Sequence, residues 1–322
     1  MKKIFSGIDV EVYHNEGDSE KKFISFSSWN SAGSGTSFGA SFFQKRNIEA
    51  YYVCQRKGNH WWHSSEMLQA ANSIKNDGKE SILYGSSMGG YAACHLQNLF
   101  SASASIAIAP QIFVDKKINP LEKRWPADLE CVNKRLSFDE VASIGAISAP
   151  TYIFYDPLHD LDANHMKILS GSIWGGDIRY FQVPYGNHDV ARVLNNSGIL
   201  KDIIISISGG DIDPGIYARC MKAYLKDKKC FLNFYRKYLS SKSIEDLEYY
   251  SEIFDSHTEN ISGLDFEGLY MLSECFFHTK KFDFAYDYMK KSLEVYRSSY
   301  RREPPNYLWL KLENIKKSLK ES

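Results

Sequence analysis

The sequence contains no long apolar run, no excess of one charge and no paired cysteine motif. No window approaches about 18 consecutive apolar residues, so we expect no membrane-spanning helix. Lys plus Arg and Asp plus Glu each total 39 residues. Because nucleic-acid-binding proteins usually carry a basic excess, this balance argues against that class. The first residues, MKKIFSGIDVEVYHNEGD, lack the long apolar stretch of a secretory signal.

Cysteine and histidine are not arranged for metal binding either. The six cysteines are scattered and form no CxxC pair, and the cysteines and nine histidines show no metal-ligand spacing. We therefore expect reduced thiols, a cytoplasmic protein, and neither a metal nor another cofactor.

What is present is a chain of ordinary globular composition that is long enough for two domains. It has 322 residues, of which 43% are hydrophobic, 24% charged and 14% aromatic. Single domains usually span about 100–200 residues. The aromatic residues suit a packed core and an aromatic-lined pocket equally, and composition does not separate the two.

Residues 1–208 alternate short β-like runs with helical segments. The expected strands cover 22–27, 50–54, 81–84, 104–109, 151–155 and 178–183, and the expected helices cover 65–75, 88–100, 164–172 and 189–206. This alternation predicts the α/β class, with a doubly wound, mostly parallel sheet and helices on both faces. The N-terminal residues IFSGIDVEVYHNE add a hairpin at one edge. Residues 110–150 interrupt this alternation of strands and helices, and we expect them to form an insertion over the sheet edge and the site.

Residues 209–322 are predicted to form a smaller all-helical domain. From Phe266 onward, six residues fall at the anchor positions of one tetratricopeptide-like helix pair: Leu269, Leu272, Phe276, Phe282, Ala285 and Met289. A helical bundle without repeat ancestry fits the same pattern equally well. We expect paired antiparallel helices here that contact a protein partner or cover the first domain.

The string GSSMGG at residues 85–90 contains G-x-S-x-G, with Ser87 at its centre. An apolar β run precedes it and a helical segment follows, which is the context of a nucleophile elbow. Gly85 and Gly89 remove side chains that would collide in this turn, and Ser87 comes to lie at a helix N-terminus. Ser87 is therefore predicted to be a nucleophile. A phosphate-binding turn, a plain tight turn and the neighbouring Ser86 are the alternatives.

A serine nucleophile needs a base and an orienting carboxylate. His188 lies in the Gly-containing loop after the last expected strand, at the sheet edge where α/β sites form; a surface histidine is the alternative. Asp160 and Asp162 follow the preceding strand, and either reaches a neighbouring loop to orient the base. The residues narrowly favour Asp162, and the other Asp would then cap the next helix. The order Ser, Asp, His is that of α/β hydrolases.

Backbone and aromatic groups are expected to complete the site. The oxyanion of a tetrahedral intermediate would bind the N–H of Met88 and a second N–H from Ser28 or Trp29, in a loop that lacks the HGGG string of many lipases. Trp29, Trp61 and Trp62 follow β runs and are expected to wall the substrate pocket. For Trp61 and Trp62, core positions at a helix start are the alternative.

These residues resemble the α/β-hydrolase superfamily through the segments YGSSMGGYAA, YDPLHDLDANH and VPYGNH. More narrowly, residues 22–190 resemble bacterial serine hydrolases associated with cell-surface polysaccharide biosynthesis. The segments that carry this resemblance are FISFSS, NHWW, IAPQ and Arg124-Trp125. An Asp three residues before a His recurs in that group, which favours Asp162, before His165, over Asp160. The resemblance does not extend to the C-terminal helices.

The sequence thus predicts a serine esterase or deacylase that acts on an acylated glycan or a small ester through Ser87, His188 and Asp162. A transacylase, in which a sugar hydroxyl replaces water at the same acyl-enzyme, would use the same residues. A non-catalytic helical-repeat adaptor with a hydrolase-like domain is the third hypothesis, and the intact Ser, His and Asp argue against it. No subsite pattern favours peptide hydrolysis.

Overall fold

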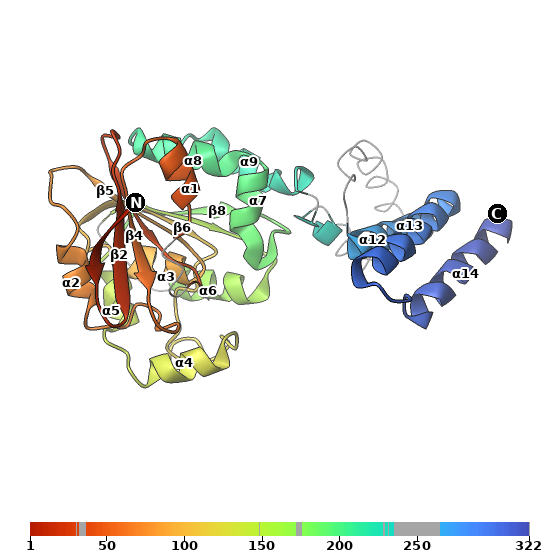
Figure 1. Cartoon of the computed structure of the whole chain (residues 1–322), viewed down its shortest axis with the longest axis horizontal. Coiled ribbons are helices and arrows are strands. Elements are labelled where there is room, and N and C mark those ends of the chain that lie inside the picture. Colours follow the sequence, from red (N-terminus) through yellow and green to blue (C-terminus); the bar gives the residue numbers. More distant parts are fainter. Residues whose placement is uncertain are drawn as a thin grey trace. The chain divides into compact units, whose positions relative to one another are not determined.

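The chain divides into two compact units, Met1–Met221 and Lys222–Ser322. The structure, a computed structural model, describes residues 1–29, 31, 37–147, 149–171, 176–227, 229–230, 232–234 and 265–321 (Figure 1). The first unit extends past the expected boundary at residue 208, because helix α9 (Gly215–Met221) packs against strand β8 (Ile178–Gln182).

An eight-stranded sheet forms the centre of the first unit, in the order β1-β2-β4-β3-β5-β6-β7-β8. Besides β8, its strands are β1 (Lys2–Ser6), β2 (Val10–Asn15), β3 (Lys22–Phe26), β4 (Ala50–Gln55), β5 (Ser81–Ser86), β6 (Ala102–Ile108) and β7 (Thr151–Tyr155). Strand β2 is antiparallel to both β1 and β4, and the remaining neighbours are parallel. The expected α/β class with a mostly parallel sheet is therefore confirmed, including the edge hairpin of β1 and β2.

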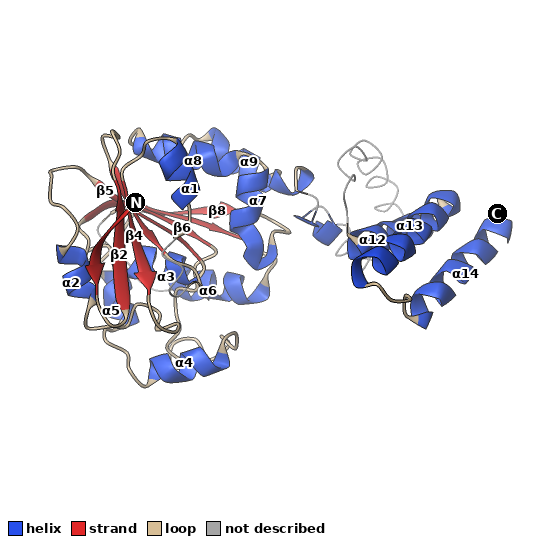
Figure 2. Ribbon diagram, viewed as in Figure 1, coloured by secondary structure: helices blue, strands red, loops and turns tan. Residues whose placement is uncertain are grey.

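Helices lie on both sides of this sheet, as Figure 2 shows. Those of the first unit besides α9 are α1 (Ala40–Lys45), α2 (Met67–Asn72), α3 (Met88–His95), α4 (Pro126–Asn133), α5 (Glu140–Gly145), α6 (Asp160–Ser170), α7 (Val190–Asn196) and α8 (Ile199–Ser208). Two 3₁₀ turns, η1 (Asn187–Asp189) and η2 (Ala223–Leu225), complete the part before residue 226. None of the helices within the described ranges is long and apolar enough to cross a membrane.

The helices differ from the expected ones at points where the backbone turns. The single helix expected over residues 189–206 is divided into α7 and α8, because Gly198 between them has φ 75°, in the left-handed region. Helix α6 begins at Asp160 rather than near residue 164, and its N-cap is His159. This earlier start brings Asp160 and Asp162 into the first helical turn.

The turn between β5 and α3 depends on two glycines. A Cβ on Gly85 would lie 2.3 Å from the carbonyl carbon of Gly89, and a Cβ on Gly89 would lie 2.6 Å from Phe26 O at the end of β3. The start of α3 therefore contacts the backbone of two sheet strands directly. Only glycine allows this approach, which is why the sequence has G-x-S-x-G here.

Replacing Gly89 with alanine is expected to lower the free energy of unfolding of the first unit by about 2 kcal/mol or more, because the methyl group would overlap a carbonyl oxygen of the sheet. The control is Gly209→Ala, since Gly209 has φ −78° and its added Cβ would lie 3.3 Å from Ser206 O. Urea unfolding followed by tryptophan fluorescence measures both variants. Equal unfolding midpoints would contradict the requirement for glycine at residue 89.

Between residues 265 and 321 the second unit consists of helices joined by short loops, namely α12 (Phe266–His278), α13 (Phe282–Tyr300) and α14 (Asn306–Glu321). Helices α12 and α13 are antiparallel: Ser273 Oγ donates to Ala285 O at 2.6 Å, and Ser292 Oγ donates to Phe266 O at 2.7 Å. Ala285 is fully buried at this crossing. The expected helix pair is present, whereas its tetratricopeptide-like ancestry and its use in protein contact stay predictions.

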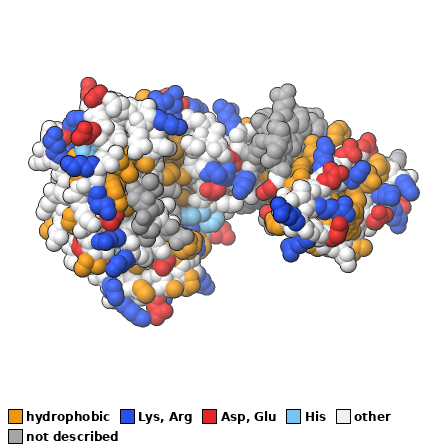
Figure 3. Space-filling model, in the orientation of Figure 1, with side chains coloured by type: hydrophobic (Ala, Val, Ile, Leu, Met, Phe, Trp, Pro, Cys, Tyr) orange, Lys and Arg blue, Asp and Glu red, His pale blue; other side chains and the backbone are white. Residues whose placement is uncertain are grey.

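Charged side chains of both signs are spread over the visible surface of each unit, without a large patch of one sign (Figure 3). This distribution agrees with the equal numbers of acidic and basic residues in the sequence.

Candidate active site

Ser87 lies at the sharp turn between β5 and α3, with φ 55° and ψ −117°. A non-glycine residue adopts a positive φ at an energetic cost, so this conformation persists only because its surroundings impose it. One such contact is the hydrogen bond from Ser87 N to Ile108 O, at 2.8 Å, which fastens the turn to the end of β6. The side chain of Ser87 is thereby held above the carboxyl end of the sheet.

The structure brings Ser87, His188 and Asp162 together. Ser87 Oγ lies 2.8 Å from His188 Nε2, and His188 Nδ1 lies 2.8 and 3.0 Å from the two carboxylate oxygens of Asp162. Arg124 Nη1 also lies 3.0 Å from Nδ1, but two carboxylate oxygens at this nitrogen call for a proton on it. We therefore assign Nδ1–H as the donor to the carboxylate and Nε2 as the acceptor of the serine hydroxyl proton. Asp160, the alternative acid, is exposed in the first turn of α6, and Asp162 is fully buried.

Asp156 links the segment that carries Asp162 to the segment that carries His188 through hydrogen bonds. It follows β7, is fully buried, and accepts hydrogen bonds from Leu158 N at 2.8 Å and from Asn187 N at 2.7 Å. Asn187 immediately precedes His188, so this one carboxylate fixes the turn before α6 and the turn after β8 at once. This positioning contact was not identified from the sequence.

A positive charge separates two buried carboxylates beside the histidine. Arg124 donates from Nη1 to Asp162 Oδ1 at 2.7 Å and from Nη2 to Glu122 Oε2 at 2.6 Å. His165 is fully buried, and its Nε2 lies 2.8 Å from the same Glu122 oxygen. Glu122 and Arg124 come from the segment between β6 and β7, which the sequence predicted as an insertion near the site.

The pKa values of both carboxyl groups are lowered. Burial opposes the charge of Asp162, but hydrogen bonds from His159 and His188, with the charges of His188 and Arg124, hold its pKa well below the usual range. Burial also opposes the charge of Glu122, yet hydrogen bonds from His165 and Arg124 lower its pKa to about 2. Both groups are therefore ionised at neutral pH, although they are shielded from water.

Gln111 is a further buried residue in contact with the serine. Its side-chain amide lies 3.0 Å from Ser87 Oγ, and the amide orientation that suits Ser87, Trp125 and Arg124 has Nε2 donating to that oxygen. The opposite orientation would instead let Nε2 donate to the Glu122 carboxylate at 3.4 Å. Gln111, Glu122, Arg124 and Asp156 show no periodicity or motif of their own. Three of them lie in segments that carry the resemblance: Gln111 in IAPQ, Arg124 in Arg124-Trp125, and Asp156 in YDPLHDLDANH.

The expected oxyanion donors lie on either side of the turn. Met88 begins α3, and no hydrogen bond from its backbone N–H is found within the described part of the chain. Ser28 and Trp29 follow β3, whose backbone α3 approaches at Gly89. Which of these two supplies a second N–H stays a prediction, and residues 30 and 32–36 of this loop lie outside the described residues.

The three tryptophans expected to wall the pocket have different positions. Trp61 and Trp62 do not line an open pocket, because both side chains are fully buried, with Trp62 packed edge-on against Phe26. Their positive φ values, 49° and 65°, belong to a tight turn that directs both rings into the core. Trp62 nevertheless supports the elbow, since its Nε1 donates to Met88 O at 2.9 Å.

Trp29 is only partly buried and stacks on Trp125, with ring centroids 4.0 Å apart. Its Nε1 donates to Asp128 at 2.7 Å, and the same carboxylate oxygen accepts from Asn59 at 3.3 Å. Trp125 in turn contacts Gln111 through its indole N–H. The stacked pair Trp29–Trp125 is therefore linked to Ser87 through Gln111.

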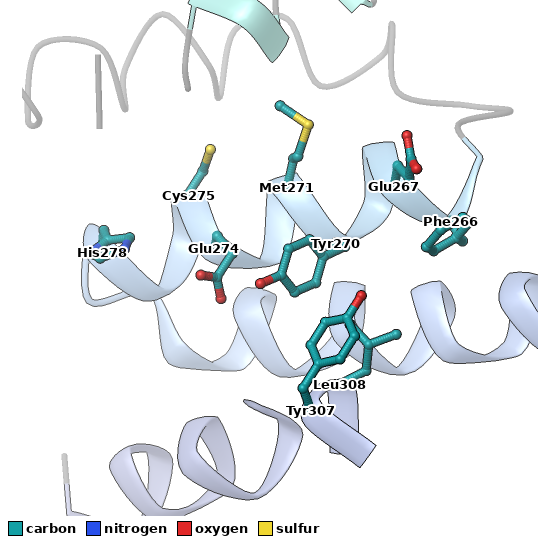
Figure 4. Close-up of a pocket in the computed structure, with 9 residues that line it drawn as sticks. All are labelled: Phe266, Glu267, Tyr270, Met271, Glu274, Cys275, His278, Tyr307 and Leu308. Carbon is teal, nitrogen blue, oxygen red and sulfur yellow. The ribbon is translucent and has the colours of Figure 1, made fainter. Parts of the chain in front are cut away.

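A pocket of about 500 Å³ occurs in the second unit. Figure 4 shows that its lining side chains come from α12 and the start of α14. They are Phe266, Glu267, Tyr270, Met271, Glu274, Cys275, His278, Tyr307 and Leu308. None of the predicted site residues lines this pocket.

No family model matches this sequence, and no curated protein matches it either. Among solved structures, the chain is similar to the capsule O-acetyltransferase of Neisseria meningitidis serogroup A, at 17% identity over 62% of this chain and 93% of that one, with a TM-score of 0.47. It is also similar to an alpha-beta hydrolase from Vibrio vulnificus, at 18% identity over 64% and 80% of the two chains, with a TM-score of 0.45.

A third similar structure is a thermophilic esterase from Thermogutta terrifontis, at 14% identity over 64% of this chain and 90% of that one, with a TM-score of 0.40. What the site can do chemically follows from its own residues.

The lowered pKa of Glu122 makes a prediction about acid stability. The folded state favours the ionised form of the Glu122 carboxyl group, so this carboxylate stabilises the fold above pH 4.5, its ordinary pKa. The stabilisation is lost as the pH falls towards about 2, the pKa in the folded state. The free energy of unfolding of Glu122→Gln should therefore fall below that of the wild type by roughly 3 kcal/mol at pH 6, with the gap narrowing towards pH 2.

Urea unfolding at a series of pH values measures this gap, with the exposed Glu16→Gln as the matched control. The control should track the wild type throughout. A gap for Glu122→Gln that stays constant from pH 6 to pH 2 would show that its charge does not stabilise the fold.

Proposed function

We propose that this protein is a serine esterase or deacylase in which Ser87 is the nucleophile, His188 the general base and acid, and Asp162 the residue that orients His188. The observation that carries the proposal is the hydrogen-bonded series from Ser87 Oγ to His188 Nε2, at 2.8 Å, and from His188 Nδ1 to Asp162, also at 2.8 Å. Ser87 also lies at a strained turn after a parallel strand, which is where a nucleophile elbow places its serine, and this position supports the same proposal.

The first half-reaction forms an acyl-enzyme. As Ser87 Oγ attacks the ester carbonyl carbon, His188 Nε2 accepts the hydroxyl proton, and the buried Asp162 carboxylate stabilises the resulting imidazolium. The carbonyl oxygen becomes an oxyanion that the N–H of Met88, with that of Ser28 or Trp29, would bind. When the tetrahedral intermediate collapses, His188 returns its proton to the leaving alcohol oxygen.

The second half-reaction regenerates the enzyme. His188 removes a proton from water, the hydroxide attacks the acyl carbonyl, and collapse releases the carboxylic acid and returns the proton to Ser87 Oγ. If a sugar hydroxyl takes the place of that water, the same acyl-enzyme gives acyl transfer. Measuring free acid against acylated acceptor separates hydrolysis from transfer, since the two differ only in the second nucleophile.

We propose an acylated glycan or a small acyl ester as the substrate, in the cytoplasm. The stacked pair Trp29–Trp125 supports a sugar or acyl ligand, because aromatic faces bind the apolar faces of both. Asp128 and Asn59, which meet at Trp29, would add hydrogen-bonding groups of the kind that sugar hydroxyls need.

Ser87→Ala is expected to abolish labelling by a fluorophosphonate probe and to lower hydrolysis of a short-chain aryl ester by roughly a thousandfold or more. Intact mass followed by peptide mapping identifies the labelled residue. The matched control is Ser86→Ala, one residue away at the end of β5, which should keep both properties. Wild-type turnover in Ser87→Ala, or a probe adduct on another residue, would overturn the proposal.

Asp162→Asn is expected to lower kcat by roughly a thousandfold or more, because an amide cannot stabilise the imidazolium and favours the wrong histidine tautomer. Asp160→Asn, two residues away on the exposed side of α6, should stay within about twofold of the wild type. Aryl ester kinetics on the two variants decide between the two acids. A larger loss in Asp160→Asn would reverse the assignment.

A further inference from the structure

We propose that Gln111 is a further catalytic residue, whose side-chain N–H donates to Ser87 Oγ and stabilises the charge that develops on this oxygen during nucleophilic attack. This inference rests on the proposed function, since it assumes that Ser87 is the nucleophile. Gln111 would donate to the nucleophile itself, whereas the backbone donors of the oxyanion hole bind the carbonyl oxygen of the substrate.

The course of the chain after β6 brings Gln111 next to Ser87. Strands β5 and β6 are parallel neighbours in which Ser86 pairs with Ile108, and Ser87 N donates to Ile108 O. The chain then turns at Ala109, with φ 42°, so that Gln111 folds back over the elbow. Gln111 is fully buried, and its amide lies 3.0 Å from Ser87 Oγ.

The neighbours of Gln111 fix which end of the amide faces the serine. The Ser87 hydroxyl has one proton, and His188 Nε2 accepts it, so Ser87 Oγ is left to accept from Gln111. On the other side, the amide oxygen faces Trp125 Nε1 at 3.2 Å and Arg124 Nε at 3.3 Å. Indole and guanidinium nitrogens donate and never accept, so these two donors favour the amide oxygen on this side. They outweigh the Glu122 carboxylate, which is a single contact at 3.4 Å and would favour the N–H, and the N–H then points at Ser87.

The surrounding charges keep this arrangement in place. The Arg124 guanidinium is held by Glu122 through Nε at 3.0 Å and Nη2 at 2.6 Å, and by Asp162 through Nη1 at 2.7 Å. Because its donors are engaged inside the protein, Arg124 is a positioning residue for Gln111 and Asp162 rather than a binding site for an anionic substrate. Trp125 has a similar positioning role through its indole N–H.

The chemical effect follows from the change in charge at Ser87 Oγ. As the proton moves to His188, this oxygen gains negative charge, and a hydrogen bond to a charged acceptor is stronger than one to a neutral hydroxyl. The Gln111 N–H therefore stabilises the transition state more than the resting enzyme, which raises kcat rather than lowering KM. The same oxygen leaves in deacylation and gains charge again, so both half-reactions benefit. The amide itself transfers no proton.

The test compares Gln111→Met, which removes the donor, with Gln111→Glu, which replaces it by an acceptor of the same size. The introduced carboxylate has the shape of the amide and still accepts from Trp125 and Arg124, so this variant serves if Gln111→Met is unstable. Its thermal midpoint measures the cost of the new contact with the Glu122 carboxylate. Each should lower kcat for an aryl acetate about 10- to 100-fold with KM nearly unchanged. The rate of fluorophosphonate labelling should fall in parallel.

The matched control is Gln97→Met, which removes another buried glutamine whose amide donates to Ser105 Oγ at 2.9 Å and Thr151 Oγ1 at 2.7 Å. Ser105 lies in the middle of β6 and Thr151 begins β7, whereas Ser87 follows the last residue of β5. Gln97→Met should therefore keep wild-type kcat, and its thermal midpoint measures what the loss of a buried amide costs the fold.

The outcomes separate this inference from the proposed function. A wild-type enzyme that is labelled at Ser87, together with Gln111 variants within twofold of its kcat, would overturn the role of Gln111 and leave the esterase proposal standing. A wild-type protein that is neither labelled at Ser87 nor active on any aryl ester would overturn both. A loss of kcat equal to that of Gln97→Met would also count against Gln111.

Discussion

The close approach of helix α3 to the sheet is the constraint on which the rest of the site depends. With glycine at residues 85 and 89, the helix backbone contacts β5 and β3 with no side chain between them. The chain must then reverse within one residue, and this forces the positive φ of Ser87. A wider turn would leave the serine hydroxyl out of reach of His188 and would displace the first N–H groups of α3 from the same space.

A second constraint is electrostatic. Asp162 and Glu122 are both buried, and two such charges would repel each other and resist desolvation if nothing lay between them. Arg124 contacts both, and His165 supplies a further hydrogen bond to Glu122. The segment between β6 and β7 therefore does more than cover the sheet: its side chains complete the charge balance of the histidine–aspartate pair.

Much of the fold was predictable from the sequence, because buried parallel strands are apolar runs and the elbow has a motif of its own. The nearness of Ser87, His188 and Asp162 also followed from strand order, since neighbouring parallel strands end at the same edge; their catalytic roles stay a prediction. Asp160 and Asp162 remained ambiguous while both were expected in a loop. In the helix that the structure has there, residues two apart point about 200° away from each other, so one is buried and the other exposed.

The remaining residues of the site could not be predicted, because their contacts are long-range. Gln111 lies 24 residues from Ser87, and Arg124 lies 38 residues from Asp162, with no pattern in between to indicate either contact. Trp61 and Trp62 were misjudged for a related reason. An aromatic residue in a loop suits a core and a pocket equally, and only the backbone turn at these two positions decides that both rings point inward.

The contact between Asp156 and the N–H of Asn187 has a consequence for how this site tolerates insertions over evolutionary time. New residues placed between β7 and α6, or between β8 and α7, would separate the carboxylate from its backbone donor and shift the imidazole away from its acid. Length variation among descendants of this chain should therefore accumulate elsewhere, for instance in the turn between α4 and α5. These two connections would stay short even where their side chains diverge.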